Sequence, residues 1–195
     1  MQQDLTMIDR EAWDGLGEAA ADPQKPFRYL TLASLGRCQF PEARTVVLRS
    51  VDISTRVLEF HTDTRSPKWQ ELQDNGNTTI LGYSDVLKLQ LRLRGEMELA
   101  PPGSLQAEQV WSRLPPHTRA TYQGGPPGDE LRPEDDAVSQ DQDSRQAETG
   151  KDRFGVLFFK ASSLDWCRLE RHNNLRARFS YGDDGELDRA CWVAP

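Results

Sequence analysis

Residues 43–68 read ARTVVLRSVDISTRVLEFHTDTRSPK, which predicts two apolar strands followed by the start of a helix. Ser66 followed by Pro67 is typical of a helix N-cap and first helical position. Cationic and hydroxyl side chains gather where the strands end and the helix begins: Arg44, Arg49, Arg65 and Lys68, with Thr62, Thr64 and Ser66. Free N–H groups at a helix N-terminus and nearby cations favour an oxygen-rich anion such as phosphate. The alternative interpretation is a solvated rim of a β-sheet that binds nothing.

The rest of the chain reads as short strands with few helices between them. Apolar alternation and apolar runs predict strands over residues 29–35, 43–53, 57–61, 78–83, 87–99, 154–159, 164–170, 175–181 and 187–193. Apolar spacing and capping residues predict helices over residues 7–21, 66–75 and 103–114. Because no long helix separates consecutive strands, parallel βαβ units are excluded. We therefore expect a single mainly β domain over residues 1–195, an antiparallel barrel or sandwich with short flanking α-helices.

The net charge of −7 is concentrated in one segment of the chain. Residues 129–152 hold nine Asp or Glu and three Lys or Arg, so the remainder of the chain is close to neutral. We expect residues 124–152 to form a mobile acidic loop, because they contain almost no apolar side chains. No basic stripe supports nucleic-acid binding, and no apolar run is long enough to span a bilayer. The sequence therefore predicts neither a nucleic-acid nor a membrane partner.

The cysteines and histidines argue against several kinds of catalytic site. Cys38, Cys167 and Cys191 are odd in number and far apart, as expected for reduced thiols of a cytoplasmic protein. No His/Cys spacing matches a zinc site, so we expect no metal. No nucleophile motif and no glycine-rich phosphate loop occurs either. The sequence identifies no catalytic residue, and a bound phosphate must be held by side chains at strand ends.

Five features, in order along residues 28–195, resemble the pyridoxamine 5′-phosphate oxidase-like family of flavin mononucleotide (FMN)-binding split barrels. Arg44 to Arg49 resembles the family's Arg-x-Val-Leu-Leu-Lys strand, His61-Thr62 its Tyr-Thr pair, and Ser66-Pro67-Lys68 its Ser-Arg-Lys motif. Gln90 precedes an alternating strand, as the family's flavin-contacting Gln does. Leu175-Arg176-Ala177-Arg178-Phe179 resembles its Leu-His-Asp-Arg-Phe, and the Ala-Pro end is also similar. The resemblance implies an antiparallel split β-barrel with Greek-key topology and FMN as the cofactor.

The resemblance also implies which residues hold the cofactor. Arg44, Ser66 and Lys68 would hold the FMN phosphate with help from Thr62, and Gln90 would reach the isoalloxazine ring. The other implied contacts from the same chain are Thr45, Val46, Val47, Arg49 and His61. Arg178 and Trp166 would come from a second subunit, because the family builds its two sites across a homodimer interface. Aromatic residues of the last strands also favour such an interface, namely Trp166, Phe179, Tyr181 and Trp192.

The family's substrate-binding residues are only partly kept. Arg49 stands in place of a Lys and Gln109 in place of a Tyr, and Asn174 and Arg176 replace an Arg-x-His pair. The candidate substrate residues are therefore Arg49, Arg113 and Arg176. The residues implied for flavin binding are thus better kept in this sequence than those implied for vitamin B6 oxidation. Three hypotheses follow: an FMN-dependent oxidoreductase acting on an unidentified small molecule, a pyridoxamine 5′-phosphate oxidase with an altered substrate site, and a flavin-binding storage or sensor protein without turnover.

Overall fold

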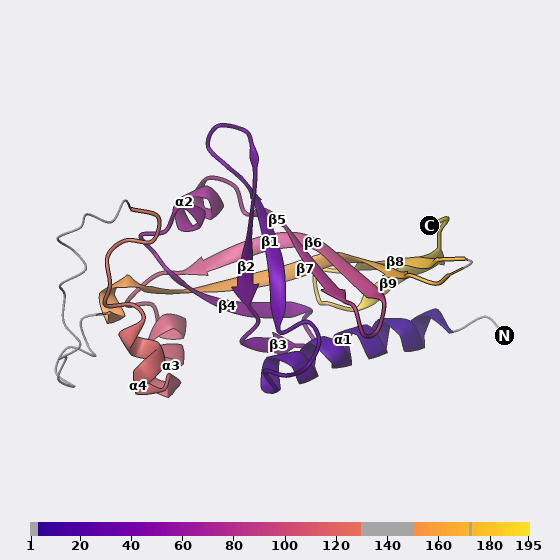
Figure 1. Cartoon of the computed structure of the whole chain (residues 1–195), viewed down its shortest axis with the longest axis horizontal. Coiled ribbons are helices and arrows are strands. Elements are labelled where there is room, and N and C mark those ends of the chain that lie inside the picture. Colours follow the sequence, from indigo (N-terminus) through magenta and orange to yellow (C-terminus); the bar gives the residue numbers. More distant parts are fainter. Residues whose placement is uncertain (1–3, 130–149, 172) are drawn as a thin grey trace.

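The computed structural model describes residues 4–129, 150–171 and 173–195, so most of the predicted acidic loop lies outside the described residues. The strands are β1 (Tyr29–Leu35), β2 (Pro41–Val47), β3 (Ser50–Asp52), β4 (Val57–Asp63), β5 (Asn77–Ser84), β6 (Leu89–Ala100), β7 (Phe154–Arg168), β8 (Leu175–Tyr181) and β9 (Leu187–Trp192). The helices are α1 (Leu5–Ala21), α2 (Pro67–Asp74), α3 (Leu105–Arg113) and α4 (Pro116–Ala120), with a short 3-10 turn η3 (Lys151–Arg153). Figure 1 shows α1 along one side of the sheet, and α3 and α4 together near the start of β7.

The nine strands of the described residues form one antiparallel sheet in the order β2-β1-β5-β6-β7-β4-β3, with β8 and β9 added beside β7. The long strand β7 organises this sheet. It pairs with β6 along its length, with β4 through its first half and with β8 through its second half. Opposite Arg94 and Gly95 of β6, a β-bulge leaves Ser162 of β7 unpaired and bends β7 where it passes from one partner to the other. The predicted antiparallel, mainly β architecture with short flanking helices is confirmed.

One face of the sheet carries the main hydrophobic core. Leu30 and Leu32 of β1 and Leu91 and Leu93 of β6 point into it, because alternate residues of a strand face the same side. Helix α1 covers this core with Trp13 and other buried side chains. The opposite face, called the outer face below, carries a second hydrophobic cluster against α3 near the start of β7, and polar or charged side chains of β6 and β8 beyond the bulge. The structure contains no helix, within its described ranges, that is long and apolar enough to cross a membrane.

Two strand predictions were wrong in their bounds. The predicted strand over residues 43–53 is two strands, because Leu48 N–H donates to the Arg28 carbonyl whereas Arg49 N–H donates to the Glu59 carbonyl. The chain thus leaves β1 and joins β4 between these two residues. The predicted strands over residues 154–159 and 164–170 are one strand, β7, whose polar middle is still paired with β6.

Candidate cofactor site

The start of α2 brings together four side chains that the sequence analysis assigned to phosphate binding. Ser66 is the N-cap residue of α2, and its buried hydroxyl donates to the Asp63 carbonyl oxygen over 2.7 Å. The hydroxyl of Thr62, at the end of β4, lies 3.3 Å from that of Ser66. Lys68 Nζ donates to Ser66 Oγ over 3.2 Å. Arg44 reaches the same region from β2, close enough for its charge to lower the pKa of Lys68.

Arg44 is held in place by two residues that the sequence analysis missed. Its guanidinium donates to the Glu71 carboxylate of α2 over 2.7 Å and to Ser34 Oγ of β1 over 2.5 Å. Ser34 Oγ in turn donates to Glu71 over 2.6 Å, which closes a triangle around a carboxylate that is only 7% exposed. These contacts join residues 27 and 37 positions apart in the chain, so no local sequence pattern signals them.

The electrostatics of this cluster favour an anion. Burial lowers the pKa of Lys68 below its ordinary value of 10.5, and the charge of Arg44 lowers it further, against the opposing charges of Asp63 and Glu71. A desolvated amine beside a second cation is stabilised when an oxygen anion binds between them. The N-terminus of α2 adds a partial positive charge at the same place. The residues present therefore fit a phosphate group.

Arg65 does not belong to this cluster, although it lies in the same stretch of sequence. Its guanidinium forms a two-pronged ion pair with Asp63, with N–O distances of 2.6 and 3.0 Å. It also donates to the carbonyl oxygen of Gly124 over 2.9 Å. Arg65 therefore anchors the chain that precedes residue 129 and is not available as a free cation.

His61 and Arg49 lie apart from the phosphate cluster, near an aromatic group packed against α3 and α4. His61 and Thr62 occupy opposite faces of β4, and the His61 ring stands edge-on to Phe154 with centroids 5.2 Å apart. Tyr122 also packs on Phe154, and burial raises the pKa of this phenol to about 12 despite the opposing charge of Arg49. Within the described part of the chain, Arg49 Nε is buried without a hydrogen-bond partner. Tyr122 was missed because no motif marks it.

The remaining assigned residues occupy other places. In β2, Val46 points into the core, whereas Thr45 and Val47 face outward. Arg113 is exposed at the end of α3. Gln90 of β6 lies opposite Cys167 of β7, which lies opposite Arg176 of β8. These three residues are on the outer face.

Arg178 and Trp166 lie on opposite faces of the sheet. Trp166 is 2% exposed, packs against Trp192 and belongs to the core. Arg178 is on the outer face, opposite Asp165, and its side chain is 57% exposed. The outer face therefore exposes Arg178, whereas Trp166 is buried on the core side of the sheet. Cys167, and not its neighbour Trp166, is the β7 residue that lies between Gln90 and Arg176 on the outer face.

Asp165 gathers the arginines of the outer face. Its carboxylate accepts two hydrogen bonds of 2.8 Å from Arg176 and one of 2.6 Å from Arg92, and Arg178 Nε lies 3.5 Å away. Burial alone would raise the pKa of this carboxyl group, but the guanidinium groups of Arg176 and Arg92 lower it to about 2. Asp165 is therefore ionised at neutral pH and fixes the direction of these arginines.

Residues 10–101 match the family model described as pyridoxamine 5′-phosphate oxidase, FMN-binding domain. Among curated proteins the chain is similar to pyridoxine/pyridoxamine 5′-phosphate oxidase 2 of Arabidopsis thaliana, with 24% identity over 172 residues that cover 85% of this chain and 84% of the relative. The predicted resemblance and the FMN cofactor are thereby confirmed at the level of the family.

Two solved structures share the fold over nearly the whole chain. A pyridoxamine 5′-phosphate oxidase-related, FMN-binding protein from Nostoc punctiforme is 20% identical, with a TM-score of 0.72 and full coverage of both chains. PhzG from Burkholderia lata, solved in complex with tetrahydrophenazine-1-carboxylic acid, is 15% identical, with a TM-score of 0.70 and coverage of 99% of this chain and 94% of that one. The predicted split-barrel fold is confirmed. The contacts assigned to individual residues stay predictions.

Proposed function

We propose that this protein, whose residues 10–101 match the family model of the pyridoxamine 5′-phosphate oxidase FMN-binding domain, is an FMN-dependent oxidoreductase that acts on a small molecule. The observation that supports it is the cluster of Arg44, Thr62, Ser66 and Lys68 at the start of α2. Its two cations and two hydroxyls suit one terminal phosphate. A pyrophosphate would call for a glycine-rich loop, which the sequence lacks.

In this proposal the chain's own residues bind and orient the flavin. Arg44, Ser66 and Lys68 bind the phosphate, Thr62 assists, and Glu71 with Ser34 holds Arg44 in position. Gln90 offers a carboxamide that both donates to and accepts from the edge of a heterocycle. The bound FMN supplies the hydride and electron chemistry. Arg49, Arg113 and Arg176 are the proposed substrate cations.

The proposal includes a homodimer, a small-molecule substrate and a cytoplasmic location. The outer face carries Gln90 and Arg178 without cover, which supports a site completed by a second subunit. All three cysteines are unpaired, which suits a reducing compartment.

The test is the absorption spectrum of the purified protein, followed by mass spectrometry of the cofactor released by heat. We expect a yellow protein that releases FMN. A colourless protein that takes up no added FMN, or release of flavin adenine dinucleotide, would contradict the proposal. Reduction by NAD(P)H with turnover of an acceptor would then separate an oxidoreductase from a storage or sensor protein.

A second candidate function is pyridoxamine 5′-phosphate oxidation, which the similarity to the Arabidopsis thaliana protein favours. We nevertheless expect little activity of this kind. Asn174 cannot supply the charge of an Arg, and Arg176 cannot act as a neutral base where the family has a His. Peroxide release from pyridoxamine phosphate by FMN-loaded protein measures this activity. A second-order rate constant near or above about 10⁴ M⁻¹s⁻¹, the low end for ordinary enzymes, would make this the first candidate.

A further inference from the structure

The outer face contains a hollow of about 490 Å³ over β6, β7, β8 and β9. Its charged lining residues are Arg92, Arg94, Arg178, Arg189 and Asp165, and we call it the arginine hollow. Residues of its wall that carry no charge include Leu164, Phe179, Cys191 and Val193. Four arginines and one aspartate thus line a space large enough for a small organic molecule.

The positive charge of this hollow is not balanced within the described part of the chain. The only carboxylate in the lining, Asp165, is already bonded to Arg92 and to Arg176, which stands beside the hollow. The guanidinium groups of Arg94 and Arg189 make no hydrogen bond or ion pair to any described residue. This surplus occurs in a chain whose net charge is −7, so it is a local feature and not a general property of the surface.

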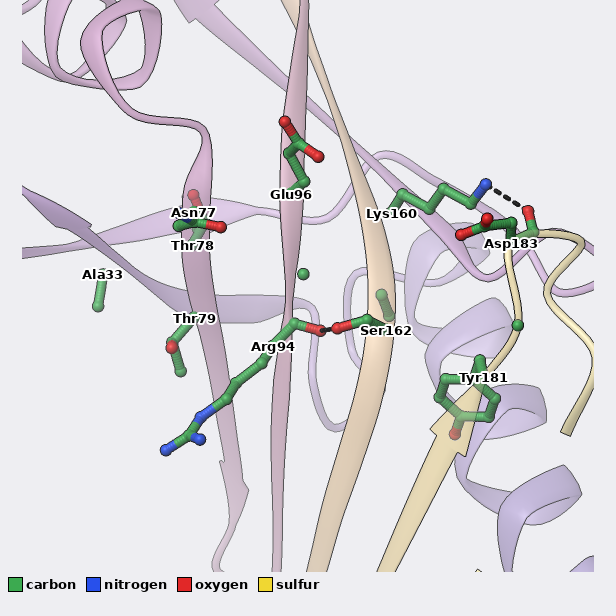
Figure 2. Close-up of a pocket in the computed structure, with 13 residues that line it drawn as sticks. Ala33, Asn77, Thr78, Thr79, Arg94, Glu96, Lys160, Ser162, Tyr181 and Asp183 are labelled. Carbon is green, nitrogen blue, oxygen red and sulfur yellow. Dashed lines mark hydrogen bonds between the residues drawn. The ribbon is translucent and has the colours of Figure 1, made fainter. Parts of the chain in front are cut away.

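A neighbouring hollow shows the contrast. It holds about 410 Å³ and is lined by Arg94 and Lys160 together with Glu96 and Asp183, so its charges balance. Figure 2 shows Glu96 and the Arg94 guanidinium projecting away from one another along β6, and Lys160 bonded to the Asp183 backbone. Arg94 borders both hollows, but the arginine hollow has a single carboxylate for four arginines, whereas its neighbour has two for two cations.

We propose that the arginine hollow is a binding site for a small organic anion that carries a carboxylate or phosphate group. Guanidinium groups match the planar oxygen pairs of these groups, and two unpaired ones, those of Arg94 and Arg189, beside Arg92 and Arg178 give the hollow a positive potential. Cys191 and Val193 add uncharged surface to the wall, which suits the carbon skeleton of such a ligand.

This site is separate, within one subunit, from the phosphate cluster at α2. Arg44 lies on the core side of the sheet, where it reaches α2 beside Ser34, whereas Arg92 and Arg94 lie on the outer face. Arg178 borders the arginine hollow and is also proposed to contact the flavin of a second subunit. Arg94 and Arg189 have no such double role, so they are the residues to vary.

The experiment uses the full chain loaded with FMN, after the flavin content of each variant has been measured by absorption. Calorimetric titration compares phenyl phosphate with phenol, and benzoate with benzamide, so that each anion has a neutral counterpart. We expect each anion that binds to do so at least about tenfold more tightly than its neutral counterpart. Arg94→Gln and Arg189→Gln should each weaken that binding by about tenfold or more, as expected for a hydrogen bond between charged groups. Arg10→Gln, which removes an exposed cation of α1, should change nothing.

Each other outcome would overturn the inference. If the anions bind no more tightly than their neutral counterparts, the surplus charge attracts no small ligand. The same conclusion holds if, in addition, the variants weaken subunit association. Anion binding that both variants retain would place the site elsewhere. Loss of flavin from either variant would assign these arginines to the cofactor. Failure of the proposed function is recognised separately, because a wild-type chain without flavin can still be titrated with the same four compounds.

Discussion

At the scale of single residues, Lys68 bonds the Ser66 hydroxyl at the start of α2, and Arg44 lies close enough to lower the pKa of Lys68. We expect Arg44→Ala and Lys68→Ala each to weaken FMN binding by about 1.5–3 kcal/mol, the range for hydrogen bonds to charged groups. Riboflavin lacks the phosphate and should bind both variants and the unmodified protein equally. Fluorescence titrations measure both affinities. Stoichiometric binding of low micromolar FMN by the double variant would place the phosphate elsewhere.

Lys68 also makes FMN binding depend on pH. Burial and the charge of Arg44 lower its pKa in the flavin-free protein, and a bound phosphate dianion would raise that pKa again. The contribution of Lys68 to FMN affinity is then complete below its pKa in the flavin-free protein, and it is lost as the pH rises from there through its higher pKa in the complex. FMN affinity should therefore begin to fall at a pH below 10.5, the ordinary pKa of a lysine. If Lys68→Ala declines over the same range, another group is responsible.

The sequence predicted which side chains gather at the start of α2 but not the residues that hold Arg44 there. Ser66, Lys68 and Arg44 are recognisable because helix starts and strand ends leave local patterns. Glu71 and Asp165 were missed, because each carboxylate meets its arginines through strand pairing or helix packing between distant segments. Trp166 was assigned from its position in the sequence. Sequence position does not reveal which face of a strand a residue occupies when both faces have aromatic or apolar neighbours.

At the scale of elements, the pairing of β6 with β7 at the bulge depends on Gly95. A Cβ atom at this position would collide with the Lys160 carbonyl oxygen and would lie 2.9 Å from Ala161 Cα. Both obstacles are backbone atoms in a paired strand, so neither can move without breaking the bulge. We expect Gly95→Ala to lower the free energy of unfolding by at least about 2 kcal/mol, within the range for overpacking. Urea denaturation measures the change.

Gly15 in α1 is the matched control for this substitution. A Cβ atom there meets no other atom within 4 Å, and alanine is the better helix former. Gly15→Ala should therefore raise the free energy of unfolding by about 0.5–1 kcal/mol. If both alanine variants are equally stable, the close approach of β6 and β7 at Gly95 does not constrain the fold.

Element types were predicted more reliably than element limits. The strand over residues 29–35 was predicted with the bounds of β1, because its apolar residues alternate and Gly36 follows it. The continuity of β7 was not predicted, because Lys160-Ala161-Ser162-Ser163 reads as a polar connection. Those residues remain in the strand because β6 pairs with them across the bulge, which is a property of tertiary pairing and not of local composition.

At the scale of the whole molecule, the outer face is the surface best suited to bind a second subunit. Of the four aromatic residues that first favoured an interface, Trp166, Phe179 and Tyr181 are buried in the subunit's own core, and Trp192 is partly exposed beside that core. The outer face instead exposes Tyr29 at 64% and Tyr83 at 49%, and Tyr83 lies opposite Gln90. A tyrosine-bearing, arginine-rich patch has the composition of an interface centre. We therefore propose that two copies pack through this face.

Subunit mixing tests this arrangement at the level of the flavin sites. Arg178→Ala and Arg44→Ala subunits, each with its own affinity tag, are combined and the heterodimer is isolated. If one site takes Arg44 from one subunit and Arg178 from the other, the heterodimer has one intact site and one doubly damaged site. We then expect half of its sites to bind FMN with the affinity of the unmodified protein, and neither homodimer to do so. If both residues serve a site within one chain, both heterodimer sites remain singly damaged and no tight site returns. A monomer in sedimentation of the unmodified protein would end the hypothesis before mixing, because Arg178 could then reach no second flavin.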